Sequence, residues 1–242
     1  MENGYISIIV NNCARTGYQN IPMIHFFNAS IKLGKSYALR NIQLEILPNE
    51  FVYLVGPSGA GKTTLLRSIY MDVFPDEGHV VVGDYSTLDM SQRDVARVRR
   101  MLGIVFQDFQ LLNDRSVFDN AALTLHLDGL SRKEIRRRVL RILAEVGLSH
   151  KRHALPESLS GGEQQRLAIA RAVLHQPDII LADEPTGNLD METAEDILRL
   201  IRKFHERGAA AVIATHNQQL VEQFPGRVIT LEGGRIREES TL

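Results

Sequence analysis

The sequence predicts an α/β fold with a mostly parallel core sheet, an antiparallel β layer near the N-terminus, and an inserted helical lobe. Three observations support this prediction. Uninterrupted apolar runs at residues 51–55, 179–182 and 210–214 have the length of strands buried on both faces of a parallel sheet. Residues 24–46 read as short strands separated by turn signals, which is typical of an antiparallel layer. Residues 108–158 carry apolar side chains at helical spacing.

The composition excludes several classes of protein. At 44% hydrophobic and 24% charged residues, it is that of an ordinary globular protein. The net charge of −1 argues against a dedicated nucleic-acid binder, which usually carries a basic excess. Cys13 is the only cysteine, which excludes an intramolecular disulfide and favours a reducing compartment. No apolar run approaches the ~20 residues of a membrane span, so we expect any membrane association to depend on a partner.

The first residues differ from the rest of the chain. Residues 1–22 show no clear period and make a poor signal peptide, so we predict a flexible N-terminal extension. A start at Met23 and a functional extension both remain open at this point. We expect residues 23–242 to form one domain, with the helical lobe inserted at about 108–158.

Residues 51–70 combine a strand, a glycine-rich loop and a helix, and the loop fits the pattern G-x-x-x-x-G-K-[ST]. Glycines let the backbone turn its N–H groups toward a phosphate, and the positive end of the helix dipole points at the same anion. Lys62 can then reach the β- and γ-phosphates, and the Thr63 hydroxyl can bind Mg²⁺. The predicted nucleotide-binding residues of this loop are Gly56, Pro57, Ser58, Gly59, Ala60, Gly61, Lys62, Thr63 and Thr64.

Tyr37, in the antiparallel layer, is the aromatic candidate for the base of the nucleotide. It is either a stacking surface for adenine or an ordinary strand tyrosine. Further on, a strand is predicted at residues 79–82, a basic helix at 91–101, and a strand at 102–106 that ends at Gln107. We interpret the arginines of the basic helix, and those of the lobe that follows, mainly as solvated faces.

A second helix N-terminus is marked by the sequence LSGGE at residues 159–163. Ser160 and Glu163 have the spacing of a capping box. Gly161 and Gly162 leave that terminus without bulky side chains, so its N–H groups could also meet a phosphate.

Two later strands deliver chemically active side chains at their carboxyl ends, where ligands bind in open α/β sheets. Asp183 and Glu184 follow the run at 179–182. Asp183 suits a Mg²⁺ ligand, and Glu184 suits a general base that positions a water molecule. His216 follows the strand at 210–214 and could contact the γ-phosphate. The chain closes with a predicted hairpin whose last residues are expected to fray.

Together these motifs resemble the ATPase subunits of the ABC superfamily, over nearly all of residues 24–237. The resemblance implies the ABC-type P-loop NTPase fold, with ATP and Mg²⁺ bound. It also implies a head-to-tail homodimer in which each loop at 56–63 faces the Ser160, Gly161 and Gly162 turn of the other copy. In order along the chain, the matching motifs are GPSGAGKT, Gln107, LSGGE, IILAD at 179–183, Glu184, GNLD at 187–190 and His216.

The resemblance also implies roles for individual residues. Glu184, His216 and Gln107 are the catalytic candidates. Thr63, Gln107 and Asp183 are the metal candidates. Gln107 would report the γ-phosphate to the helical lobe.

Within the superfamily, ADEPTGNLD is similar to the lipoprotein-releasing, macrolide-exporting and FtsE cell-division ATPases. The stretch at residues 105–120, together with EIRRRV at 134–139, is most similar to the FtsE family. This resemblance implies an FtsX-like integral membrane partner, peripheral attachment to the cytoplasmic side of the cell membrane, and ATP-driven control of cell-wall hydrolysis. A lipoprotein- or drug-export ATPase is the alternative.

The sequence disfavours two other classes of nucleotide-binding protein. A soluble clamp acting on ribosomes or DNA usually has two cassettes or a long coiled-coil insertion, which 242 residues do not accommodate, so no nucleic-acid partner is expected. A nucleotide-dependent scaffold with negligible turnover is disfavoured because both Glu184 and His216 are present.

Overall fold

The structure is a computed structural model that describes residues 21–127 and 129–241. The predicted extension at 1–22 therefore lies almost entirely outside the described residues. Within them, no helix combines the length and the apolar character that crossing a membrane requires.

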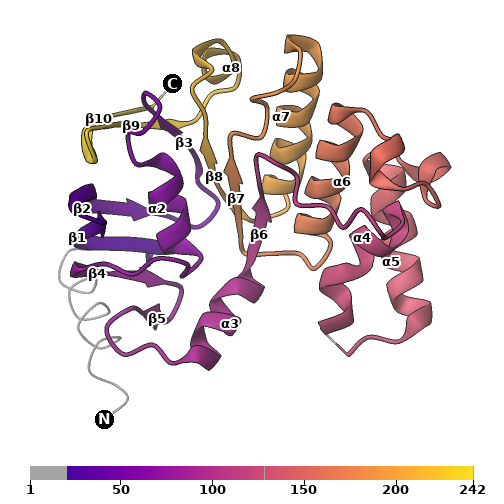
Figure 1. The fold of residues 1–242 in the computed structure, drawn as a ribbon, viewed down its shortest axis with the longest axis horizontal. Coiled ribbons are helices and arrows are strands. Elements are labelled where there is room, and N and C mark those ends of the chain that lie inside the picture. Colours follow the sequence, from indigo (N-terminus) through magenta and orange to yellow (C-terminus); the bar gives the residue numbers. More distant parts are fainter. Residues whose placement is uncertain (1–20, 128, 242) are drawn as a thin grey trace.

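Two sheets form the framework, and both have the predicted character (Figure 1). The smaller, antiparallel sheet has the order β2-β1-β4-β5. The larger sheet has the order β10-β9-β3-β8-β7-β6, and all its pairings are parallel except that of β10 with β9. The strands of the first sheet are β1 (Ile24–Leu33), β2 (Ser36–Ile46), β4 (Glu77–Val82) and β5 (Tyr85–Ser86). Those of the second are β3 (Phe51–Val55), β6 (Leu102–Val105), β7 (Ile179–Asp183), β8 (Ala210–Ala214), β9 (Arg227–Glu232) and β10 (Arg235–Thr241).

The helices divide between the two sides of the core sheet. α2 contacts β2 and β4 of the antiparallel sheet and β7 and β8 of the core sheet, so it is packed between the two. Figure 1 shows α6 and α7 beside the core strands, with α4 and α5 at the end farthest from the antiparallel sheet. The α-helices are α2 (Lys62–Ile69), α3 (Gln92–Met101), α4 (Val117–Ala122), α5 (Arg132–Glu145), α6 (Gly161–Val173), α7 (Met191–His205) and α8 (Gln218–Gln223). The 3₁₀ turns are η1 (Leu123–Leu127), η2 (Ser149–Lys151) and η3 (Pro156–Ser158).

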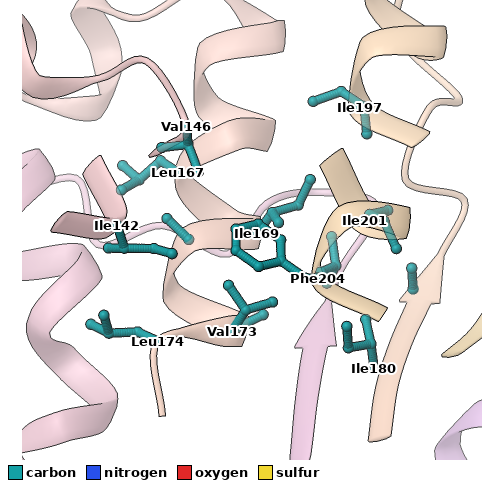
Figure 2. Close-up of a cluster of buried hydrophobic side chains, with 14 of the residues drawn as sticks. Ile142, Val146, Leu167, Ile169, Val173, Leu174, Ile180, Ile197, Ile201 and Phe204 are labelled. Atoms are coloured by element: carbon teal, nitrogen blue, oxygen red, sulfur yellow. The ribbon is translucent and has the colours of Figure 1, made fainter. Parts of the chain in front are cut away.

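Two buried apolar clusters hold these layers together. One fills the space around α2, between the two sheets. The other joins the core sheet to α5, α6 and α7, and Figure 2 shows its centre. There, Ile180 of β7 lies beside Phe204 and Ile201 of α7, and Ile142 of α5 faces α6. Because burying one such side chain contributes about 1.5–3 kcal/mol, the cluster fixes α6 firmly against the sheet.

The beginning of the predicted helical segment is wrong: residues 108–116 contain no helix. Phe109 and Gln110 adopt the left-handed backbone region, with φ of 58° and 46°, which a right-handed helix cannot include. The buried side chain of Asn120 replaces helical hydrogen bonds. It accepts from Leu112 N at 2.8 Å and donates to the carbonyl oxygens of Leu112 and Arg115, both at 3.0 Å.

The end of the described chain also departs from expectation. The residues before Leu242, predicted to fray, continue β10 as far as Thr241 in register with β9. Arg227 of β9 donates to Glu239 Oε2 at 2.5 Å and to Glu50 Oε1 at 2.9 Å. The pairing and this charged contact explain why the strand persists.

Candidate functional site

The glycine-rich loop after β3 is held in a conformation that requires glycine. Gly56, Gly59 and Gly61 have φ of 147°, 77° and 108°, a region that other residues rarely adopt. A Cβ on Gly56 would lie 2.1 Å from the Leu231 carbonyl oxygen. Gly61 directly precedes α2, and no side chain caps that helix. The N–H groups of its first turn therefore face the space above the loop, which is the arrangement that binds anions.

The turn between β9 and β10 supports this loop from behind. Gly234 N donates to the Ala60 carbonyl at 3.1 Å, and its own carbonyl accepts from Arg40 N of β2 at 2.7 Å. A Cβ on Gly234 would lie 2.6 Å from the Ala38 carbonyl oxygen. Through Gly234, the loop is thus connected both to β2 and to the hairpin of β9 and β10.

Lys62 is buried, and its ammonium group lies over the loop. Nζ donates to the Gly56 carbonyl at 2.8 Å and to the Pro57 carbonyl at 3.3 Å, and lies 3.5 Å from Glu184 Oε1. These oxygens surround the ammonium with negative charge inside the loop. A phosphate oxygen placed above the loop would be within reach of the same group.

Glu184 joins the ends of two core strands. Its backbone is left-handed, with φ of 46°, and its N–H donates to the Ala214 carbonyl of β8 at 3.0 Å. Its carboxylate accepts from His216 Nδ1, 2.8 Å from Oε2. A left-handed backbone at a residue other than glycine costs free energy and occurs preferentially at functional sites. The turn aims Glu184 toward Lys62 and His216.

Asp183 presents a buried oxygen that suits a metal ion. Oδ1 has no hydrogen-bond partner among the described residues. Burial raises the pKa of this carboxyl group, and a hydrogen bond from Thr63 opposes that shift. A buried carboxylate oxygen without a partner, next to a hydroxyl group, is a suitable donor set for Mg²⁺. The residues present therefore fit the predicted ion.

One cavity of about 340 Å³ collects most of the predicted residues. Lys62, Glu184 and His216 lie on its wall together with Gln107, which comes from the end of β6. Four elements that are far apart in the sequence therefore meet at one opening. The remaining lining residues are Leu33, Ala38, Ser58, Gly59, Gly61, Thr63 and Thr64.

Tyr37 is not among the lining residues. Its hydroxyl donates to Glu77 Oε1 at 2.9 Å, and the charged groups of Lys32 and Arg40 each lie 4.8 Å from the centre of its ring. The structure therefore favours the strand-tyrosine interpretation. Leu33 and Ala38, which the sequence analysis did not select as binding residues, form the wall near β1 and β2 instead. No sequence signal distinguishes them from other apolar strand residues.

The predicted capping box at the start of α6 is present, away from the cavity. Ser160 Oγ accepts from Glu163 N at 3.3 Å, and Glu163 Oε2 accepts from Ser160 N at 2.9 Å. Lys151 Nζ lies 2.7 Å from Glu163 Oε1, a contact that no sequence pattern indicated. Gly162 is buried, and a larger residue would not fit there, because its Cβ would lie 2.7 Å from Thr193 Cγ2. The Ser160–Gly162 segment is therefore a fixed, separate surface.

Replacing Glu163 by glutamine should weaken the fold in a pH-dependent way. The Lys151 ammonium and the cap hold the pKa of Glu163 at about 2, below its ordinary value of 4.5. A lowered folded-state pKa stabilises the fold above about pH 4.5, and this contribution disappears as the pH falls toward 2. Urea unfolding followed by circular dichroism should show the largest wild-type advantage at neutral pH. The exposed Glu222→Gln is the control, and a Glu163→Gln difference independent of pH would contradict the prediction.

The chain is similar in sequence and in structure to known proteins. The family model described as ABC transporter matches residues 39–187. The cell division ATP-binding protein FtsE of Streptococcus pneumoniae strain D39 is 45% identical over 84% of this chain and 89% of its own length. FtsE of Bacillus subtilis is 44% identical over 84% and 90%. FtsE of Escherichia coli K12 is 43% identical over 88% and 97%.

Solved structures of ATP-binding cassettes are also similar to this chain. A dimeric structure of the ATP-binding cassette MJ0796, in a post-hydrolysis state bound to ADP and Pi, matches with a TM-score of 0.83. It is 37% identical, over 91% of this chain and 99% of that one. A second dimeric structure of MJ0796 also matches at 0.83, with 38% identity and the same coverage.

Proposed function

This chain belongs to the ABC transporter family and is an ATPase, and on that premise we propose that it drives an FtsEX-like membrane complex in cell division. The observation that carries the proposal is the cavity in which Lys62, Gln107, Glu184 and His216 meet. The cell-division role is supported by 43–45% identity to FtsE proteins over 84–88% of the chain.

The chain's own groups supply the chemistry of hydrolysis in this proposal. Lys62 and the N–H groups at the start of α2 bind the β- and γ-phosphates and stabilise the charge that develops on them. Glu184 orients the attacking water and accepts its proton, and His216 holds the Glu184 carboxylate through the 2.8 Å contact. Thr63, Asp183 and Gln107 would hold Mg²⁺, which when bound neutralises phosphate charge.

A second copy of the chain would complete the site. The Ser160–Gly162 turn begins α6, whose first turn includes the N–H groups of Gly161 and Gly162, yet none of these residues lines the described cavity of its own chain. A head-to-tail dimer would place this turn over the γ-phosphate held by the other copy. The matching cassette structures at 37–38% identity are dimeric, which supports the association of two copies. ATP binding would then close the dimer, and hydrolysis would open it.

The membrane partner would dock beside Gln107. A cavity of about 320 Å³ is lined by Phe109 and Leu111, with Glu157 and Gln164 from the segment around the start of α6. Phe109 is two residues beyond Gln107, which lines the nucleotide cavity. A partner bound beside Phe109 would therefore sense whether the ATP site is occupied. In this proposal, the chain would lie peripherally on the cytoplasmic side of the membrane, held there by its partner.

Association with the membrane partner should be weakened more than basal ATP hydrolysis by each of three substitutions, Phe109→Ala, Leu111→Ala and Phe118→Ala. The reason is that Phe109 and Leu111 line the proposed docking cavity and Phe118 follows in α4, whereas none of the three lines the nucleotide cavity. Co-purification with the partner and ATPase assays on the same preparations measure both effects. Leu88→Ala, an exposed leucine after the antiparallel sheet, is the matched control. An intact complex in all three variants would refute this docking surface.

The whole proposal is tested by purifying the tagged full chain from membranes and identifying what accompanies it. Recovery of a four-span, FtsX-like protein supports the cell-division complex. Recovery of a larger permease with a periplasmic domain would instead favour lipoprotein or drug export.

A further inference from the structure

Arg171, in the last turns of α6, carries a positive charge in the interior of the protein. The residue is only 9% exposed, and burial lowers the pKa of its guanidinium. Among the described residues, no carboxylate forms an ion pair with it. Nη1 donates to the Gln110 carbonyl at 2.6 Å, and Nη2 donates to the Phe109 carbonyl at 2.8 Å. A buried charge balanced only by carbonyl dipoles is costly, so its contacts need an explanation.

The two carbonyls belong to the left-handed turn at Phe109 and Gln110, which begins two residues after Gln107. Left-handed residues other than glycine persist only where surrounding contacts hold them. The planar guanidinium presents two parallel donors that match two neighbouring carbonyls, which a lysine cannot do. Arg171 therefore selects the conformation of the segment that carries Gln107.

The other end of α6, its N-terminus, is formed by the Ser160–Gly162 turn. Arg171 lies ten positions after Gly161 in α6, which corresponds to roughly 15 Å of rigid helix. The lobe meets the same position, because Thr124 Oγ1 donates to the Arg171 carbonyl at 3.4 Å. The apolar cluster in Figure 2 fixes the body of this helix between α5 and α7. Arg171 thus joins the Phe109 and Gln110 turn to the same helix that begins at the Ser160–Gly162 turn.

We propose that Arg171 is a positioning residue that joins the Gln107 segment to α6, so that γ-phosphate contact at Gln107 places the Ser160–Gly162 turn for the second copy. This inference rests on the proposed function for the role of that turn. Arg171 itself does not line the nucleotide cavity. Its loss should therefore leave nucleotide binding intact and impair the step that needs both halves of the site.

The test uses Arg171→Met, which removes both donors, and Arg171→Lys, which keeps the charge. The sequence contains no tryptophan, so Phe109→Trp gives a single fluorescent reporter on the turn itself. In this background, we expect Arg171→Met to bind ATP within about twofold of the parent and to lower kcat at least ~10-fold with little change in KM. The ATP-induced fluorescence change should disappear in Arg171→Met and be partly recovered in Arg171→Lys.

Arg141→Met, an exposed arginine on α5, is the matched control and should behave as the parent does. Thermal unfolding shows whether each variant is folded. If Arg171→Met does not fold, the fluorescence change and kcat of Arg171→Lys decide the test. A fluorescence response and kcat that remain at parental values in the folded variant would overturn the inference, as would a loss of ATP affinity as large as the loss of kcat. An inactive wild-type chain would instead count against the proposed ATPase mechanism, and the fluorescence of the Phe109→Trp variants would still test the link.

Discussion

Glu184→Gln is expected to bind ATP, to hydrolyse it roughly 10²–10³-fold more slowly, and to accumulate as an ATP-bound dimer. Glutamine has nearly the same shape, so the left-handed turn and the bond to the Ala214 carbonyl should persist. It cannot accept a proton from water, and it removes the negative charge 3.5 Å from Lys62 Nζ. The ammonium is then free to interact with phosphate alone. Single-turnover hydrolysis and analytical ultracentrifugation with ATP measure the two effects.

Glu206→Gln, at the exposed end of α7, provides the control for the same chemical change at an unrelated site. It should hydrolyse ATP at the wild-type rate and show the wild-type monomer–dimer equilibrium. A wild-type rate in Glu184→Gln would show that another group positions the water. Slow hydrolysis without dimer accumulation would retain Glu184 as the base but contradict closure by a second copy.

Lys62→Ala should lower ATP affinity roughly ten- to hundredfold, because a hydrogen bond to a charged group contributes about 1.5–3 kcal/mol. The ammonium is buried within the phosphate loop, so neighbouring side chains cannot replace it. The effect should be largest for nucleotides with a γ-phosphate and small for adenosine. Equilibrium binding of ATP, ADP and adenosine to the purified chain measures this order.

Lys133→Ala removes an exposed lysine from the first turn of α5 and should leave ATP affinity unchanged. If Lys62→Ala also bound ATP with wild-type affinity while folded, the loop would not be the phosphate site. An equal loss of affinity for adenosine would point to a disordered loop and not to a lost phosphate contact.

The parts of the site that could be predicted from sequence are those that local spacing determines. The loop at 56–63 follows a strand and opens a helix, and Ser160 and Glu163 are one helical turn apart, so each pattern implies its own geometry. Asp183 and His216 were placed near one another because parallel strands end at the same edge of a sheet. In the structure, Asp183 ends β7 and pairs with Ala214 of β8, and His216 lines the nucleotide cavity.

Contacts between distant residues could not be predicted in this way. Arg171 and Gln110 are 61 residues apart, and nothing in either neighbourhood indicates that the guanidinium is buried against that turn. The non-helical start of the lobe depends on the Asn120 side chain, which competes with the helical bonds that apolar spacing suggests. Tyr37 was a candidate because of its residue type, but Glu77, Lys32 and Arg40 hold it outside the cavity.

The turn at Gly234 sets a lower limit on the length of chain that can work. The family model matches the chain only as far as residue 187. The Ala60 carbonyl of the phosphate loop nevertheless accepts a hydrogen bond from Gly234, which lies well beyond that match. The Leu231 carbonyl also forms the surface against which Gly56 is packed. We therefore expect that a fragment must include the hairpin formed by β9 and β10 in order to bind nucleotide. During synthesis, the loop acquires these supporting contacts only after residue 234 has been made.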